Sequence, residues 1–67
     1  MGNVAKITEI SAESTVSFDD AMKVGIARAA KTLQNVEGAW IKEQKAVIKD
    51  GKVTAYRVTM KITFILK

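Results

Sequence analysis

The residues that could carry out chemistry in this chain are few, because its 67 residues include no histidine and no cysteine. General acid–base work would fall to Lys42, Glu43 or Tyr56, and no nucleophile is paired with a base at a recognisable spacing. The missing residue types also exclude a disulfide framework and a zinc site made of the ordinary ligands. We therefore expect a protein that is not an enzyme.

Binding is the remaining chemistry, and the single tryptophan, Trp40, is its first candidate. Trp40 could be a platform for stacking an aromatic ligand. It could instead be an interface aromatic that packs against the aliphatic stem of Lys61 or against a neighbouring subunit, and we favour this second interpretation. Gln44 and Arg57 could hold an anion or the edge of a heterocycle, or they could form a polar pair between strands or a salt bridge to a neighbouring protomer.

Ions and nucleic acids are two further partner classes to weigh. Carboxylates at Glu9, Glu13, Asp19 and Asp20 could supply oxygens to a hard cation such as calcium, although no loop has the ligand spacing of an EF-hand. Negative charge in the first turn of a helix explains the two aspartates without a metal. The net charge of +4 is spread along the chain rather than clustered, so nucleic-acid binding is not expected.

The elements that must position these residues are dominated by a long β-hairpin from Ala39 to Leu66. Asp50-Gly51 is a strong signal for a two-residue turn, because a type I′ turn needs positive φ at both central positions. This turn predicts a register in which paired residues share a face of the sheet. The predicted pairs are Lys49 with Lys52, Ile48 with Val53, Gln44 with Arg57, Ile41 with Met60, Trp40 with Lys61 and Ala39 with Ile62.

The two faces of the hairpin differ in character. The alternation predicts an apolar face that carries Tyr56, Val58, Met60, Ile62, Phe64 and Leu66. The opposite face is polar and basic, but the predicted register also places four apolar residues on it, namely Trp40, Ile48, Val53 and Ile65. A single helix cannot cover both faces, so the second face needs a partner.

A strand and a helix precede the hairpin. We expect the strand over Val4–Ser11 and the helix over Ser17–Asn35, with Ser17 as the N-cap, Asp20 completing an approximate capping box and Gly38 as the stop signal. The apolar stripe of the helix comprises Phe18, Ala21, Met22, Gly25, Ile26, Ala29 and Leu33, while Val24 lies away from it. Gly25 either marks a close approach of the helix to the sheet or is a tolerated small residue.

The predicted fold is therefore α+β, in one domain over residues 1–67. A β-α-β-β protomer would carry a three-stranded antiparallel sheet, with the last strand in the centre, wrapped around one helix. A chain of this length buries only roughly 60% of its unfolded surface, so we expect a closed homo-oligomer to cover the rest. No apolar run is long enough to span a membrane and no signal-peptide pattern is present, so we expect a cytoplasmic location.

Three stretches of the sequence resemble the dodecin family. They are Ile26–Leu33 in the helix, Lys49–Gly51 at the turn and Tyr56–Phe64 in the last strand, and the resemblance extends over nearly the whole chain. It implies a small β-α-β-β protomer, of which twelve copies form a hollow shell. It also implies a storage or buffering role, because the best-known members bind flavins such as FMN and riboflavin in pairs without catalysis.

This chain departs from the flavin-binding members at the ligand positions. The family's flavin-stacking Trp, just after the helix, corresponds to Gly38, and the Gln that binds the pyrimidine edge corresponds to Arg57, which can only donate hydrogen bonds. Lys45 matches a basic position that contacts phosphate groups in some members, although a lone lysine is usually solvated. A branch of the family that lacks the Trp has been linked to calcium and carries a segment similar to Ile41–Gln44.

We interpret the sequence as that of a non-enzymatic, dodecin-like hollow homo-oligomer that binds or sequesters a small molecule. The candidate binding residues are Trp40, Gln44, Lys45 and Arg57, and we expect riboflavin and FMN to bind weakly or not at all. The alternatives are a structural or ion-binding shell, with calcium as one candidate ion, and a basic nucleic-acid-binding module.

Overall fold

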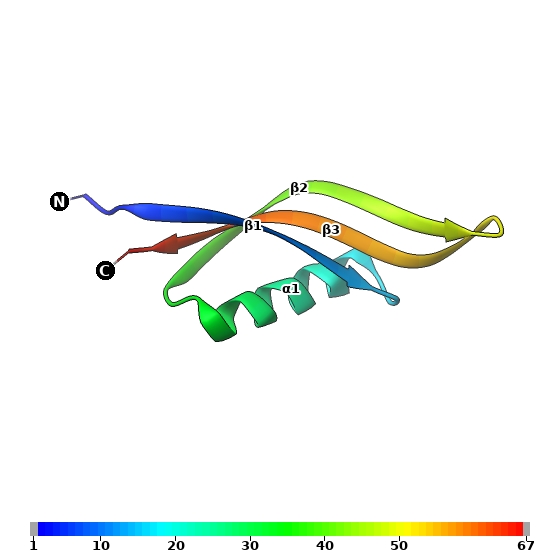
Figure 1. Ribbon diagram of the computed structural model, residues 1–67, viewed down its shortest axis with the longest axis horizontal. Helices are drawn as coiled ribbons and strands as arrows, with labels where there is room; N and C mark the ends of the chain where they lie inside the picture. The colour runs from blue at the N-terminus through cyan, green and yellow to red at the C-terminus, as the bar shows by residue number, and fades with distance from the viewer. Residues whose placement is uncertain (1, 67) are drawn as a thin grey trace.

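The structure is a computed structural model that describes residues 2–66, so the two end residues of the expected domain lie outside it. Its elements are β1 (Ala5–Ser14), α1 (Phe18–Thr32), β2 (Val36–Lys49) and β3 (Lys52–Ile65). The strands form one antiparallel sheet in the order β1-β3-β2, and α1 covers one of its faces (Figure 1). The predicted fold class and strand order are confirmed.

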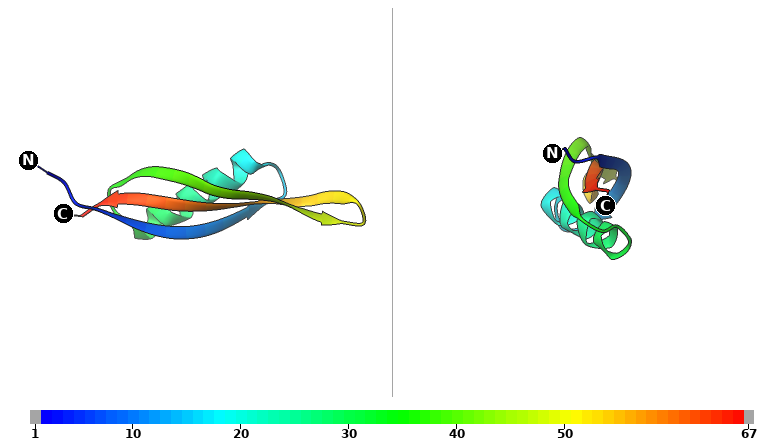
Figure 2. Two further views of the ribbon diagram at one scale, coloured as in Figure 1. Left: turned by 90° about the horizontal axis from the view of Figure 1, so that it is seen from above. Right: turned by 90° about the vertical axis from the view of Figure 1, so that its left-hand side faces the viewer.

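The hairpin turn forms where the sequence placed it. Asp50 has φ 53° and Gly51 has φ 75°, which is the pair of positive values that a type I′ turn requires. The turn end of the hairpin extends well past α1, which gives the molecule an elongated outline of 53 × 19 × 13 Å (Figure 2). A long part of β2 and β3 therefore has no helix beneath it.

The start of α1 is fixed by two serines. The Asp20 amide donates to the Ser17 hydroxyl at 2.9 Å, which confirms Ser17 as the N-cap. The Asp20 carboxylate accepts a hydrogen bond of 2.6 Å from the hydroxyl of Ser14, the last residue of β1. Asp20 therefore ties the helix to the preceding strand, which is a role that the predicted capping box did not include.

The predicted end of the helix is wrong by three residues. The helix stops at Thr32, and Asn35 takes φ 61°, a left-handed conformation that asparagine tolerates better than most residues. Because Asn35 makes the reversal, β2 begins at Val36 and Gly38 lies inside the strand rather than acting as the stop signal. The predicted hairpin, which began at Ala39, was correspondingly too short.

Strand β1 runs three residues beyond its predicted end at Ser11. The additional residues continue the ladder with β3, with Ala12 opposite Val58, Glu13 opposite Arg57 and Ser14 opposite Tyr56. The polar composition of this segment had indicated a connection rather than a strand. In a strand, however, alternate residues face the helix and the solvent, so only Ala12 and Ser14 face the helix. Ala12 is small and apolar, and the hydroxyl of Ser14 has a hydrogen-bond partner.

The core lies between α1 and the central strand. Val58, Met60 and Ile62 of β3 are almost fully buried, with 2%, 0% and 0% exposure. The predicted helix stripe packs on them, and the Phe18 ring meets Tyr56 edge-on with the ring centroids 5.0 Å apart. Within residues 2–66, no helix has the length and apolar character needed to cross a membrane.

Gly25 marks a close approach of the helix to the sheet. A Cβ atom at this position would lie 2.5 Å from Met60 Cε and 2.9 Å from the Ala12 Cβ. The methionine tip could move, but the Ala12 Cβ is fixed to the backbone of β1. Of the two interpretations of Gly25, a close approach of the helix to the sheet is therefore correct, and a merely tolerated small residue is not.

We predict that Gly25→Ala destabilises the protein by about 1–2 kcal/mol, because overpacking at the helix–sheet contact outweighs the better helix propensity of alanine. The free energy of unfolding from denaturant titration measures this change. Ala30→Gly, at an exposed position of the same helix, is the matched control and is expected to cost about 1 kcal/mol. A Gly25→Ala variant that is more stable than the parent protein would contradict the close approach.

Candidate ligand-binding face of the sheet

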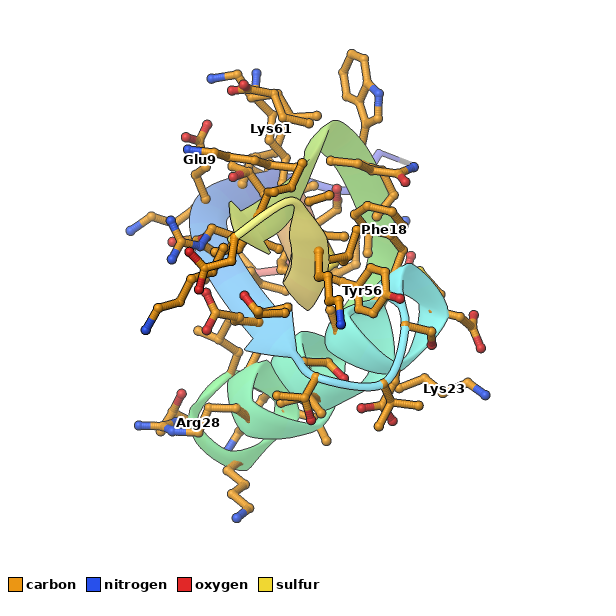
Figure 3. The ribbon with its side chains drawn as sticks, turned by 90° about the vertical axis from the view of Figure 1, so that its right-hand side faces the viewer. Glu9, Phe18, Lys23, Arg28, Tyr56 and Lys61 are labelled. Carbon is orange, nitrogen blue, oxygen red and sulfur yellow. The ribbon has the colours of Figure 1, made fainter. Side chains whose placement is uncertain are left out.

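The candidate site lies on the face of the sheet that points away from α1, called here the outer face. Residues that pair across the ladders share a face, and the buried residues of β3 alternate with those that point outward. Figure 3 shows Glu9 and Lys61 on this face, opposite the helix that carries Lys23 and Arg28. The ladders assign to it Ile7, Glu9, Ser11, Glu13, Gly38, Trp40, Glu43, Lys45, Arg57, Thr59, Lys61 and Thr63, and the ion pair with Glu9 adds Lys42.

Trp40 is the most prominent side chain of the outer face. It belongs to β2, an edge strand, and is 69% exposed. Lys61 is its partner across the ladder, as predicted, and the Lys61 ammonium lies 5.5 Å from the centroid of the indole ring. This is cation–π geometry, in which the ring's negative face attracts the cation. The predicted pairing of Trp40 with Lys61 is therefore confirmed, but the group that lies over the ring is the ammonium and not the predicted aliphatic stem.

Two irregularities change the register in the middle of the hairpin. Lys42 is an extra residue in β2, and Thr54 is an extra residue in β3, so the ladder is displaced by one residue between them. The predicted pairing of Gln44 with Arg57 is wrong, because Gln44 lies opposite Val58 and Lys45 lies opposite Arg57. These two bulges cancel, so the pairing predicted for Ala39, Trp40 and Ile41 and next to the turn is correct, and a third irregularity, at Glu37, lies before the predicted hairpin.

The displaced register separates the predicted binding residues. Trp40, Lys45 and Arg57 are on the outer face, while Gln44 is on the helix side, where it borders a hollow beside Phe18 and Met22. Gln44 therefore cannot act together with Arg57. By the same alternation Ile48 and Val53 lie on the helix-side face, beyond the end of α1, and not on the face of Trp40 as predicted.

Ion pairs cross the outer face from strand to strand. Arg57 donates from Nε and Nη2 to the same oxygen of Glu13, at 3.1 and 2.7 Å. Lys42 reaches over β3 to Glu9, with 3.3 Å between Nζ and Oε1. Both pairs are about half exposed, so each stabilises the fold only modestly. Within residues 2–66, Lys45 and Lys61 have no carboxylate at ion-pair distance.

Sequence reasoning missed the roles of Glu9, Glu13 and Lys42 on this face. The strand order offered a usable signal, since a central β3 places its cations Arg57 and Lys61 opposite the carboxylates of β1. The reach of Lys42 had no such signal, because it depends on the bulge that turns this residue outward.

The four carboxylates considered for calcium are each engaged within the protomer. Glu9 and Glu13 are ion-paired, Asp19 pairs with Lys23 at 3.1 Å, and Asp20 accepts from Ser14. In the described part of the chain, no three acidic, histidine or cysteine side chains lie together in a way that could hold a metal ion. The described residues of a single protomer therefore do not gather their carboxylates at one point.

The residues present do not fit a flavin held as the family resemblance implies. Gly38 lies opposite Thr63 on the outer face, and a Cβ atom built on it would meet nothing within 4 Å. There is space for an aromatic side chain at this position, but glycine provides no ring on which a flavin could stack. Trp40 is the next outer residue along β2, displaced by roughly 7 Å, and Gln44 faces the other side of the sheet.

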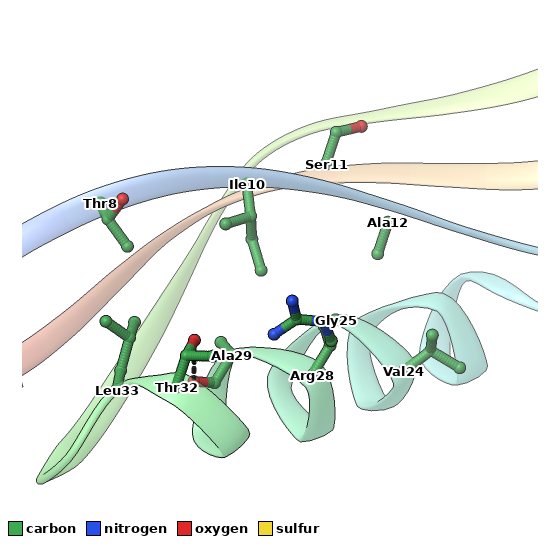
Figure 4. A pocket seen from close by; sticks show the side chains of 10 residues that line it. All are labelled: Thr8, Ile10, Ser11, Ala12, Val24, Gly25, Arg28, Ala29, Thr32 and Leu33. Atoms are coloured by element: carbon green, nitrogen blue, oxygen red, sulfur yellow. Dashed lines mark hydrogen bonds between the residues drawn. The ribbon is translucent and has the colours of Figure 1, made fainter.

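A second hollow, of about 480 Å³, lies between β1 and α1 (Figure 4). Its walls are mainly aliphatic, from residues such as Ile10, Ala12 and Leu33, and Arg28 is the one charged residue among those that line it. Val24, which the sequence placed away from the helix stripe, borders this groove and is half exposed. Besides Arg28, the polar residues among those that line it are Thr8, Ser11 and Thr32, and we interpret the groove as a packing surface.

Comparisons with known proteins give one consistent result. The family model described as Dodecin matches residues 4–67. A curated dodecin from Thermus thermophilus is 31% identical over 67 residues, which cover 100% of this chain and 97% of the relative. The solved dodecin of Streptomyces davaonensis has a TM-score of 0.93 at 31% identity, with 100% of this chain and 98% of that chain covered.

A calcium-binding relative is also similar. The structure of a calcium dodecin from Mycobacterium tuberculosis, described as having a novel calcium-binding site, has a TM-score of 0.82 at 25% identity. The match covers 96% of this chain and 91% of that chain.

We predict that double-mutant cycles will detect the displaced register. Replacing Glu13 and Arg57 by alanine, singly and together, should give a coupling energy of about 0.5–1 kcal/mol at low salt, as expected for an exposed two-bond ion pair. The matched cycle with Gln44→Ala and Arg57→Ala should give a coupling indistinguishable from zero, because the two side chains lie on opposite faces. A larger coupling for Gln44 than for Glu13 would refute the two bulges.

Proposed function

Because the chain belongs to the dodecin family, we propose that it is a non-enzymatic protein that assembles into a hollow homo-oligomer. We propose that each protomer binds a small molecule on the outer face of its sheet, which is the face that points away from α1. The observation that carries this proposal is the exposed Trp40 with the Lys61 ammonium over its ring, on a sheet face that α1 leaves uncovered. An exposed ring beside basic side chains can stack a planar ligand and attract a charged one.

The need for assembly follows from the uncovered apolar residues. Ile7 on the outer face is 57% exposed, and Ile48 and Val53 beyond the end of α1 are 63% and 49% exposed. Edge strands β1 and β2 also present unpaired backbone groups. Symmetric copies that cover these residues would complete the burial that a chain of this size cannot achieve alone.

The first test is the state of assembly. Sedimentation should give a species of roughly twelve copies, as in the family shell, with no folded monomer at micromolar concentration. Ile48→Lys should weaken the assembly, because it removes an uncovered apolar side chain and adds a charge. Gln34→Lys, which adds the same charge at an exposed position in the connection between α1 and β2, is the control and should assemble normally. A stable folded monomer of the parent protein would refute the shell.

Flavin affinity is the second test. Riboflavin should bind weakly or not at all, because Gly38 has no ring to stack on the isoalloxazine. Gly38→Trp should strengthen binding at least about tenfold, since a ring adds buried apolar area and aromatic stacking worth more than 1.4 kcal/mol together. Open space around the Cβ position allows the substitution without a clash within the protomer.

Quenching of riboflavin fluorescence measures both affinities. Trp40→Ala is the companion variant, because it shows whether any riboflavin that does bind is stacked on the indole ring of Trp40. Tight binding by the parent protein that disappears in Trp40→Ala would show that Trp40 has taken over the stacking role, and the flavin would then be the small molecule.

An ion-binding shell is the second candidate function, favoured by the similarity to a calcium dodecin. A calcium site here would need carboxylates from more than one protomer, because the engaged carboxylates of a single copy do not gather. The absorbance spectrum, mass and metal content of the protein as purified from cells distinguish the two functions. Bound organic ligand supports sequestration of a small molecule, whereas stoichiometric calcium in a colourless shell supports the alternative.

A further inference from the structure

We propose that the ligand stacked on Trp40 is an aromatic anion, and that Lys61 is the residue that selects its negative charge. This inference deepens the proposed function and rests on it. It concerns the charge of a small molecule bound at a position that differs from the family's stacking position, since position 38 has no ring and Trp40 lies elsewhere on the strand.

The position of Lys61 results from an exchange of partners on the outer face. Glu9 lies directly opposite Lys61 on the neighbouring strand, so these two would be the simplest ion pair. Instead Glu9 pairs with Lys42, whose side chain crosses β3 from the bulge in β2. Among residues 2–66, Lys61 is thereby left without a carboxylate at ion-pair distance, and it lies over Trp40 with 5.5 Å between Nζ and the ring centroid.

The Lys61 ammonium over the Trp40 ring affects which ligands can stack on that ring. A neutral ring that covers the Lys61 side of the indole must displace the ammonium and lose the cation–π attraction. A ring that carries a carboxylate or phosphate can keep the ammonium beside it as a counter-ion, and no existing ion pair has to break. The anion therefore gains a charge-assisted contact that its neutral counterpart does not have.

The surrounding charges favour the same ligand class. Cations outnumber carboxylates on the outer face, and two of the three carboxylates, Glu9 and Glu13, are already paired. Lys45 is a second cation of this face without a carboxylate partner in the described range. With the two ion pairs set aside, Lys45 and Lys61 remain against Glu43, so an incoming anion meets a net positive charge that attracts it over a distance of about one Debye length.

Two probes of the same shape test the inference. Naphthalene-2-carboxylate carries a negative charge at neutral pH, and naphthalene-2-carboxamide is its neutral counterpart. We expect the assembled protein to bind the carboxylate about fivefold more tightly at low salt, and the preference to shrink as salt is raised. Calorimetry gives the affinities, and quenching of Trp40, the single tryptophan, locates the binding.

Three variants assign the preference to Lys61. Lys61→Gln should abolish it, Lys61→Arg should retain it, and Lys31→Gln, which removes the same charge from the helix, should leave it unchanged. Sedimentation of each variant verifies that it assembles as the parent protein does. Equal affinities of the parent protein for both probes, or a preference that survives in Lys61→Gln, would overturn the inference while leaving small-molecule binding intact. Binding of neither probe, with no change in Trp40 emission, would overturn the proposed function as well.

Discussion

The close contact between Gly25 of α1 and the sheet is the constraint on which the rest of this structure depends. The missing side chain lets the helix backbone settle against Ala12 of β1 and Met60 of β3. Because this contact lies on the β1 side, the helix packs on β1 and β3 and makes few contacts with β2. One edge strand and the turn end of the hairpin are thereby left without cover. The exposure of Ile48 and Val53, beyond the end of the helix, follows from where the helix is held.

The parts of the fold that were predictable are those in which local chemistry and periodicity agree. Asp50-Gly51 fixed the turn, Ser17 fixed the start of the helix, and the regular alternation of β3 identified the buried residues. The end of the helix was not predictable in the same way. Asn35 and Gly38 can both reverse a chain, and the choice between them depends on how β2 docks beside β3.

The candidate site was only half predictable, for a reason that lies in the sequence of β2. Residues 42–45 are all polar, so no alternation marks which of them faces the helix. A bulge at Lys42 therefore leaves no trace in the hydropathy pattern, and the compensating extra residue at Thr54 restores the expected pairing near the turn. Trp40 and Lys61 lie outside the displaced segment and were paired correctly, whereas Gln44 lies within it and was assigned to the wrong face.

The position of the aromatic ring along β2 also determines its electrostatic surroundings. A ring at position 38 would lie opposite Thr63, which is neutral, whereas the ring at position 40 lies opposite Lys61. Moving the aromatic residue by one outward-facing position thus exchanges a hydroxyl neighbour for an ammonium that binds the face of the indole. Cross-strand pairing gives every residue of an edge strand a fixed neighbour on the central strand. In this dodecin the position of the ring on β2 therefore also determines that its neighbour on β3 is charged.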